Sequence, residues 1–231
     1  GVLEITLASN KMKVINIVNT EEYLYSVLPS EMISWWPEEA LKAQAVIART
    51  QAFYRKNVAR MHRKDGYDLC SSQHCQVYSG IKQEVPRTTR AVDETRGEVA
   101  QYKGRYMHTL FSSNCSGHTQ SCNELKGWGH EPFLIGTIDG QTAFPDSPYE
   151  FRKWLQFAPD IYCAPSRNTY YAESRWIRIV KQSDIAERMG RTKNIGRIKK
   201  IVPLKRSASG HINHLLIQGE NGNIEIEREH I

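Results

Sequence analysis

Apolar and polar residues alternate in several short segments of the chain, and this alternation is typical of β-strands with one covered face. The first two segments, residues 2–7 and 13–18, lie at the N-terminus. Later segments flank Lys103-Gly104 and Asn221-Gly222, and a two-residue turn of this kind between alternating segments predicts a β-hairpin.

Apolar residues at helical spacing predict two helices in the first quarter of the chain. We expect the first to begin at Thr20, a residue type that caps helices, and to end just before Pro29. A longer helix is predicted from about 37 to 60, where one face carries Leu41, Ala45, Ala48 and Ala52.

Polar residues of the longer helix fall on two faces. Lys42 and Arg49 are seven positions apart and share a face, which is either a solvated surface or a binding surface. Gln44 falls on the apolar face, so we expect it to be buried. Its amide would pair either with a loop backbone or with the segment that contains Glu31.

Two short helices are predicted at 148–156 and 184–190. Strands outnumber helices beyond residue 76, and no internal repeat or low-complexity linker interrupts the chain. The class is therefore α+β, with residues 1–231 forming a single domain in which the long helix packs on a β-rich body with hairpins.

The chain of 231 residues has a formal net charge of +6, but its lysines and arginines are scattered rather than concentrated in a run. This distribution argues against nucleic acid as a partner. The charge either keeps the surface soluble or attracts polyanions, such as those of a bacterial envelope. No stretch of about 18 apolar residues is present. Because the sequence opens on Gly1 rather than Met, we expect any export signal or membrane anchor to have been removed from it.

Glu31 is the first candidate for chemistry. It stands between Pro29 and a group of apolar residues that includes Trp35 and Trp36. An apolar setting favours the protonated form of a carboxyl group, as a general acid requires, whereas a surface or helix-capping role is the simpler alternative.

The cysteines, five in number, provide the second candidate. Cys70, His74 and Cys75 lie within six residues, and His62 precedes Cys70 by eight. The segment therefore holds the ligand types of a four-coordinate zinc site, although not the spacing of a standard zinc finger. Unpaired core cysteines are the alternative interpretation.

Five segments carry a resemblance to a known family: LPSEM, PEEALKAQAVIARTQAFY, HCQVYSG, AVDETRGEVAQYKGRYMHTLFSSNCSGHTQS and RSASGHINHLLIQG. Taken together and in this order, they resemble the stage II sporulation protein D family of lytic transglycosylases, which includes the modifier-of-amidase relatives. The resemblance runs from about residue 14 to the end of the chain.

The resemblance implies an extracytoplasmic enzyme of the periplasm, an intermembrane space or the cell wall. Such a lyase cleaves the MurNAc–GlcNAc bond of peptidoglycan strands stripped of stem peptides and leaves 1,6-anhydro-MurNAc ends. It implies a substrate groove between lobes, a cell-wall amidase and a membrane-anchored complex as partners, and a role in sporulation or cell division. The alternative is a non-catalytic peptidoglycan-binding module that enhances a partner amidase.

Carried over to this sequence, the catalytic glutamate of the family falls on Glu31, and its groove residues fall on Lys42, Gln44 and Arg49. One carboxyl group suffices in this mechanism, because the nucleophile is the C6 hydroxyl of the substrate itself. Lys42 and Arg49 would position the glycan, and Gln44 would orient the acid.

Some members of the family bind zinc through two cysteines and two histidines just before the CQVY segment. The resemblance therefore implies that His62, Cys70, His74 and Cys75 hold a structural Zn²⁺ ion.

The CSGHTQSC segment departs from the Ser-Ser-x-Gly-Gly-x-Thr pattern that family members carry in a loop lining the groove. From the resemblance we expect Ser112, Ser113 and His118 to contact sugar. A disulfide between Cys115 and Cys122 is expected in an oxidising compartment. A second metal site in this segment lacks an obvious fourth ligand.

Overall fold

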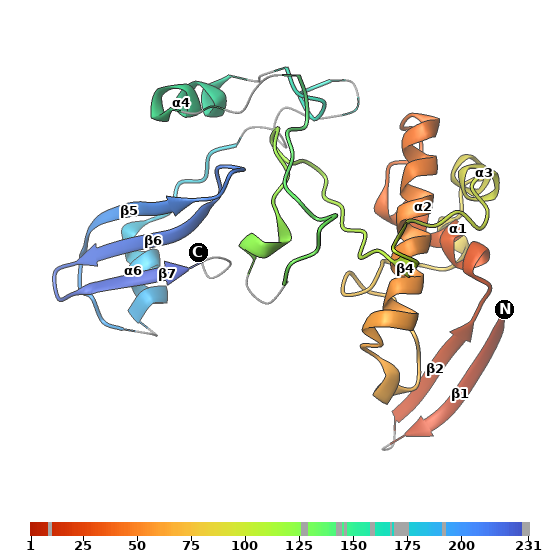
Figure 1. The fold of residues 1–231 in the computed structure, drawn as a ribbon. Helices are drawn as coiled ribbons and strands as arrows, with labels where there is room; N and C mark the ends of the chain where they lie inside the picture. The colour runs from red at the N-terminus through yellow and green to blue at the C-terminus, as the bar shows by residue number, and fades with distance from the viewer. Residues whose placement is uncertain are drawn as a thin grey trace. The chain divides into compact units, whose positions relative to one another are not determined.

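A computed structural model of the chain describes residues 1–8, 11–125, 129–141, 145, 147–157, 160–166, 168, 176–190 and 193–227. The chain divides into two compact units, Gly1–Phe111 and Ser112–Ile231 (Figure 1). Helices and small antiparallel sheets occur together in the chain, so the predicted α+β class is confirmed. The assignment of the whole chain to one catalytic domain stays a prediction, as does the groove between lobes.

The elements of the first unit are, in chain order, β1 (Val2–Ala8), β2 (Lys11–Ile17), α1 (Thr20–Glu31), α2 (Glu38–Tyr54), the π-helical turn η1 (Arg55–Ala59), the 3₁₀ helices η2 (Arg63–Asp65) and η3 (Ile81–Gln83), α3 (Pro86–Glu94), β3 (Gln101–Tyr102) and β4 (Arg105–Tyr106). Strands β1 and β2 pair antiparallel along their whole length. Between β3 and β4, Lys103 and Gly104 both have positive φ, as a type I′ turn requires. The predicted N-terminal strands and this hairpin are confirmed.

Helix α1 differs from the prediction at both ends. The side chain of Asn19, rather than Thr20, caps its N-terminus. The helix continues through Pro29 to Glu31, so the prediction that proline ends it is wrong. Proline removes the hydrogen bond of its own missing N–H and crowds the carbonyl group four residues earlier, but the helix still completes its last turn. The amide of Met32 still closes the last turn, 3.0 Å from the carbonyl oxygen four residues earlier. Glu31 therefore belongs to a helix end and not to a loose turn.

The core of the first unit lies among α1, α2 and α3. Its fully buried residues come from all three helices: Leu24, Val27, Leu28, Leu41, Ala45, Ala48, Ala91 and Val92. The apolar face predicted for the long helix is therefore present. It packs mainly against two other helices, however, and not against a β-rich body.

The helix predicted from about 37 to 60 has two parts. Its α-helical part is α2, which ends at Tyr54. The π-helical turn Arg55–Ala59 follows, and Arg60 then adopts a positive φ of 49°. The chain turns away at this residue and enters the segment that holds the predicted metal ligands.

Arg49 lies in the interior of the first unit, although Lys42 on the same predicted face is partly exposed. The Arg49 guanidinium forms a two-pronged ion pair with the Glu21 carboxylate, with Nη2–Oε2 at 2.6 Å and Nε–Oε1 at 2.9 Å. It also donates to the carbonyl oxygens of Glu98 and Val92, each at 3.1 Å. The expectation of a shared exposed face is wrong for Arg49, because α1 and the chain at and after α3 enclose it.

We expect replacement of Arg49 by Met to destabilise the first unit by about 3–5 kcal/mol, because it leaves the Glu21 carboxylate buried without its partner. The measurement is chemical denaturation followed by circular dichroism. Lys42→Ala is the matched control on the same helix. It removes only exposed ion pairs and should change the denaturation midpoint far less. Equal shifts for the two variants would contradict the structural role of Arg49.

The elements of the second unit are η4 (Cys122–Glu124), α4 (Pro148–Gln156), α6 (Gln182–Gly190), β5 (Ile198–Arg206), β6 (Ile212–Gly219) and β7 (Asn223–Glu227). The three strands form one antiparallel sheet in the order β5-β6-β7, and α6 packs on it around Ile195, Ile198 and Ile217 (Figure 1). Both predicted short helices and the predicted C-terminal hairpin are confirmed. No helix in the described part of the chain combines the length and the apolar character that crossing a membrane requires.

Candidate functional site

Glu31 is the last residue of α1, and one of its oxygens is fixed by the backbone. The Val77 N–H donates to Glu31 Oε1 at 2.8 Å. Among the described residues, no hydrogen-bond partner is found for Glu31 Oε2, and the side chain is only partly buried. One oxygen of this carboxyl group thus serves as an anchor, and the other is available to a ligand.

The segment that anchors Glu31 is itself held across α1 and α2. Gln76 is buried, accepts from the Tyr23 hydroxyl at 3.2 Å and donates to the Ala48 carbonyl oxygen at 3.1 Å. Two residues after Val77, the Ser79 N–H donates to the Ser26 hydroxyl at 3.1 Å. These contacts fix the direction of the Val77 N–H. Local sequence patterns do not predict these contacts, because they join residues 28 to 53 positions apart.

Tyr23 is a neighbour of Glu31 that sequence reasoning missed. Its ring stacks on Tyr78, with centroids 5.3 Å apart. Burial raises the pKa of the Tyr23 hydroxyl, and the nearby acidic groups of Cys75 and Glu31 raise it further. Tyr23 therefore stays a proton donor, and its hydrogen bond helps to hold the anchoring segment.

The apolar residues that follow Glu31 do not enclose it. Trp35 is 52% exposed and Ile33 is 37% exposed. They form an apolar surface beside the end of α1, which suits contact with the faces of sugar rings as well as contact with another protein.

Lys42 and Gln44 differ sharply in their surroundings. Lys42 Nζ lies 2.8 Å from a Glu94 carboxylate oxygen, 3.0 Å from one of Glu39 and 3.8 Å from one of Glu38. These acidic partners, Glu94 first, raise the pKa of Lys42 and also neutralise its charge. Gln44 is buried as predicted, with 8% exposure. Its Nε2 has no hydrogen-bond partner among the described residues.

The four predicted metal ligands come together in the loop after η1. One ligand atom from each of His62, Cys70, His74 and Cys75 lies within 4.8 Å of all the others. His74 Nδ1 is central, at 3.2 Å from His62 Nε2 and 3.6 Å from each cysteine Sγ. Ligands at about 2.0–2.3 Å from a tetrahedral ion stand about 3.3–3.8 Å apart, so the arrangement fits zinc.

Neighbouring groups prepare this set for a cation. The Asp65 carboxylate lies 3.0 Å from His62 Nδ1, which leaves Nε2 for a metal, and such a carboxylate–histidine pair is common around zinc. Burial alone would raise the pKa of Cys70, but hydrogen bonds from Ser72, His74 and Cys75 outweigh it and lower the pKa to about 5. A lowered pKa favours the thiolate, which is the form that binds metals. Burial, in contrast, raises the pKa of Cys75.

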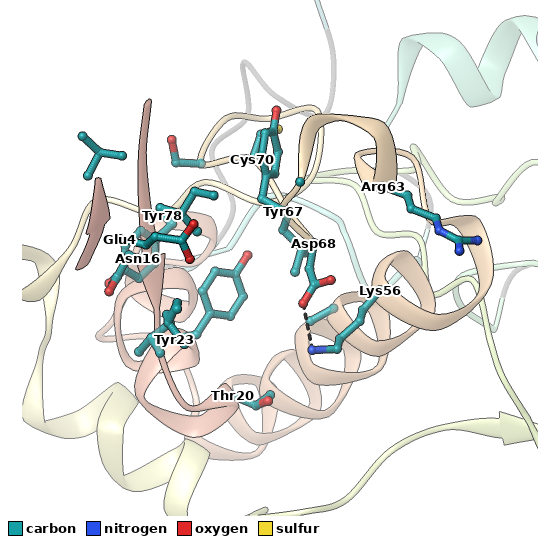
Figure 2. Close-up of a pocket in the computed structure, with 18 of the residues that line it drawn as sticks. Glu4, Asn16, Thr20, Tyr23, Lys56, Arg63, Tyr67, Asp68, Cys70 and Tyr78 are labelled. Carbon is teal, nitrogen blue, oxygen red and sulfur yellow. Dashed lines mark hydrogen bonds and ion pairs between the residues drawn. The ribbon is translucent and has the colours of Figure 1, made fainter. Parts of the chain in front are cut away.

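A cavity of about 1220 Å³ lies beside the metal-ligand set, bordered by β2, α1 and the end of α2 (Figure 2). Tyr23 points into it, and the ion pair between Lys56 Nζ and Asp68 Oδ2, at 2.8 Å, closes one side (Figure 2). Glu31 is not among the described residues that line this cavity. This cavity and the candidate acid are therefore separate features.

The residues expected to contact sugar beyond residue 111 belong to the second unit. Ser112 and Ser113 are exposed, whereas His118 is buried and its Nδ1 lies 2.6 Å from the Thr119 carbonyl oxygen. Their contact with the same glycan as Glu31 stays a prediction.

The expected disulfide between Cys115 and Cys122 is not formed. Cys122 is buried, and its Sγ accepts from the Glu131 N–H at 3.2 Å. Cys115 Sγ instead lies 3.7 Å from Cys163 Sγ. The sequence spacing suggested the near cysteine, but the fold brings the distant one to Cys115.

Comparison with known proteins identifies the first unit. The model of the Stage II sporulation protein family matches residues 8–102. This part of the chain is therefore similar to members of that family, including relatives named amidase enhancer and stage II sporulation protein D. The matched residues of the Stage II sporulation protein family domain contain Glu31, the groove candidates of α2 and all four metal-ligand candidates. Ser112, Ser113 and His118 lie outside the match.

Three relatives of this chain differ in their names. An uncharacterized protein of Brachyspira hyodysenteriae is 43% identical over 128 residues, which is 55% of this chain. The amidase enhancer of Bacillus subtilis is 36% identical over 117 residues, or 50% of this chain. The stage II sporulation protein D of Bacillus amyloliquefaciens is 33% identical over 114 residues, or 44%. The matches cover 34%, 15% and 33% of these relatives, so the chain spans at most about a third of the length of each.

Proposed function

We propose that this chain is a peptidoglycan lytic transglycosylase that acts outside the cytoplasm on glycan strands stripped of stem peptides. The observation that carries the proposal is the state of the Glu31 carboxyl group. Its Oε1 is anchored by the Val77 N–H at 2.8 Å, and its Oε2 has no hydrogen-bond partner among the described residues. An acid held in one direction with one oxygen available is what proton transfer to a bound substrate requires.

In the proposed reaction, protonated Glu31 donates its proton to the glycosidic oxygen between MurNAc and GlcNAc, and the bond from that oxygen to the MurNAc C1 breaks. The Glu31 carboxylate then accepts the proton of the MurNAc C6 hydroxyl, whose oxygen attacks C1 and closes the 1,6-anhydro ring. No water enters the step. A second carboxylate, which other glycosidases use as nucleophile or as base for water, is therefore not needed.

Zinc would have a structural role in this site. His62, Cys70, His74 and Cys75 would complete a closed four-ligand shell, which leaves no position for substrate. When bound, the ion would fix the conformation of the loop and with it Cys75, which Gln76 and Val77 follow directly. The metal-ligand set therefore supports the N–H group that anchors Glu31.

The groove residues of α2 would contribute unequally. Gln44 has a buried donor without a partner among the described residues, and this donor suits a glycan hydroxyl or carbonyl oxygen. The charge of Lys42 is shared with three carboxylates, so it would orient a strand rather than attract it. Arg49 would act through the fold, because direct contact with glycan would require its buried ion pair to break.

A second candidate function is a non-catalytic module that binds peptidoglycan and enhances a cell-wall amidase, alone or within a membrane-anchored complex. The name of one relative, amidase enhancer, favours it. The apolar surface of Ile33 and Trp35 beside Glu31 would then serve a protein partner.

Product analysis separates the two functions. The protein is incubated with purified glycan strands, either stripped of stem peptides or intact, and the products are analysed by mass spectrometry. Transglycosylase activity predicts 1,6-anhydro-MurNAc ends, formed faster from stripped strands. Strand binding with no anhydro product, together with faster stem-peptide release by an added amidase, would overturn the proposal in favour of the second function.

A further inference from the structure

A group of possible metal ligands in the second unit has no role in the proposed reaction. Cys115, Asp139 and Cys163 each offer one ligand atom, and these atoms lie within 4.8 Å of one another. Cys115 Sγ is 3.7 Å from Cys163 Sγ and 3.3 Å from Asp139 Oδ2. Asp139 lies 24 positions after Cys115, and Cys163 lies 48 positions after Cys115, so only the fold brings the three residues together.

The backbone around the three side chains is tied together by hydrogen bonds. The Asp139 N–H donates to the Gly117 carbonyl oxygen at 2.9 Å, and the Tyr162 N–H donates to the Asp139 carbonyl oxygen at 3.0 Å. The segments that carry Cys115 and Cys163 are therefore fixed on either side of Asp139. Two isolated β-bridges, one between residues 118 and 138 and one between 140 and 161, extend this pairing.

Further contacts hold the candidate ligands themselves. The Cys163 N–H donates to Asp139 Oδ2 at 3.2 Å, and the Asn114 side chain donates to the Cys163 carbonyl oxygen at 3.1 Å. Next to Cys115, the Ser116 carbonyl oxygen accepts from the indole N–H of Trp154, which is buried. Hydrogen bonds of this kind around ligating groups orient them and support metal affinity.

We propose that Cys115, Asp139 and Cys163 form a second metal site, for zinc or a similarly thiophilic divalent cation. Two sulfurs at about 2.3 Å from a tetrahedral ion stand about 3.8 Å apart, and a sulfur and a carboxylate oxygen stand about 3.5 Å apart. The observed 3.7 and 3.3 Å are close to these separations. Binding forms two metal–sulfur bonds and releases the thiol protons to solvent.

Three protein ligands leave the fourth position of this site to water. All three side chains are partly exposed, so water can reach the ion. The set in the first unit offers four protein ligands, so this site has one protein–metal bond fewer. We therefore expect this site to lose zinc to a chelator before the set formed by His62, Cys70, His74 and Cys75 does.

A disulfide between Cys115 and Cys163 is the competing outcome. It would require an oxidant, such as a low-molecular-weight disulfide or dioxygen, to remove two electrons and two protons from the thiols. A disulfide would also leave Asp139 without its sulfur contact, whereas a cation uses all three groups. The position of the carboxylate at the sulfurs therefore favours a metal.

The test measures zinc content after the purified protein is equilibrated with zinc and then dialysed. The Cys163→Ser variant should contain about one equivalent of zinc less than the wild type. The Asp139→Asn variant should bind that equivalent at least about tenfold more weakly. Cys122→Ala, which removes a cysteine outside the site, should lose none. The Cys70→Ser variant should still bind zinc at the site formed by Cys115, Asp139 and Cys163. Its zinc content therefore distinguishes this site from the one in the first unit.

Two further measurements complete the test. With cobalt in place of zinc, the thiolate-to-cobalt absorption assigned to this site should vanish in Cys163→Ser and shift in Asp139→Asn. Asp139→Asn preserves the shape of the side chain, so it gives an answer even if Cys163→Ser does not fold. Equal zinc content in wild type and both variants would overturn the proposal. So would mass spectrometry showing Cys115 joined to Cys163 in protein purified without added oxidant.

Discussion

Replacing Glu31 by Gln should abolish the formation of anhydro ends and leave the fold intact. The amide oxygen of Gln can still accept the Val77 N–H, so the anchor of the side chain is retained. The amide cannot donate a proton to the glycosidic oxygen or accept one from the C6 hydroxyl. General acid–base catalysis contributes about 10²–10⁴-fold to rates, and we expect a loss of activity of this size.

The matched control for this variant is Glu22→Gln on the same helix. Glu22 lies at the exposed start of α1, where its only described ion pair is a contact of 3.9 Å with the N-terminal amine. It should keep full activity. Glu31→Asp adds a second test, because the shorter side chain cannot reach both the Val77 N–H and a substrate, so activity should fall while the acid remains. Undiminished turnover by Glu31→Gln would remove this residue from the mechanism.

Local patterns in the sequence predicted most elements correctly, because the features that define those elements are local. Turn residues of fixed type predicted the hairpins at Lys103-Gly104 and Asn221-Gly222, and helical spacing predicted the apolar face of α2. The end of α1 was mispredicted at Pro29. One missing hydrogen bond in the last turn of a packed helix does not stop it when neighbouring helices cover that turn.

Arg49 shows why a helix face cannot be interpreted from spacing alone. It is seven residues from Lys42 and points in nearly the same direction from α2. The environment changes along that face, however. Lys42 meets exposed carboxylates, whereas Arg49 meets Glu21 of α1 and carbonyl groups at and after α3. These partners lie 28 to 49 positions away, and the sequence pattern contains no signal for them.

The two possible metal sites differ in the same way. His62, Cys70, His74 and Cys75 lie within one short segment, so ligand types and a family resemblance were enough to select all four. The site in the second unit joins three segments. Nothing in the sequence around Asp139 marks it as a ligand, and the sequence analysis predicts the nearer Cys122 as the partner of Cys115.

Loss of zinc from the first unit should strongly lower the stability of the loop that holds the ion. Structural zinc sites in small domains contribute about 10–16 kcal/mol of apparent binding free energy. The three-helix core should keep α1, α2 and α3 folded without the ion, so the loss should be concentrated in residues 62–79. Cys70→Ser, or chelation of the wild type, should lower the thermal midpoint and increase hydrogen exchange at the Val77 amide.

Because the Val77 N–H anchors Glu31, the same treatment should also slow glycan cleavage, although no zinc ligand contacts the substrate in the proposed reaction. Zinc added back should restore both exchange protection and cleavage in the wild type but not in Cys70→Ser. Cys122→Ala is the control, because it removes a cysteine of the second unit and should leave both readouts unchanged. The hypothesis fails if the purified protein retains no zinc at this set and both Cys70 and Cys75 react as free thiols. It also fails if chelation leaves exchange at Val77 as slow as before, since the ion would then have no part in holding the acid.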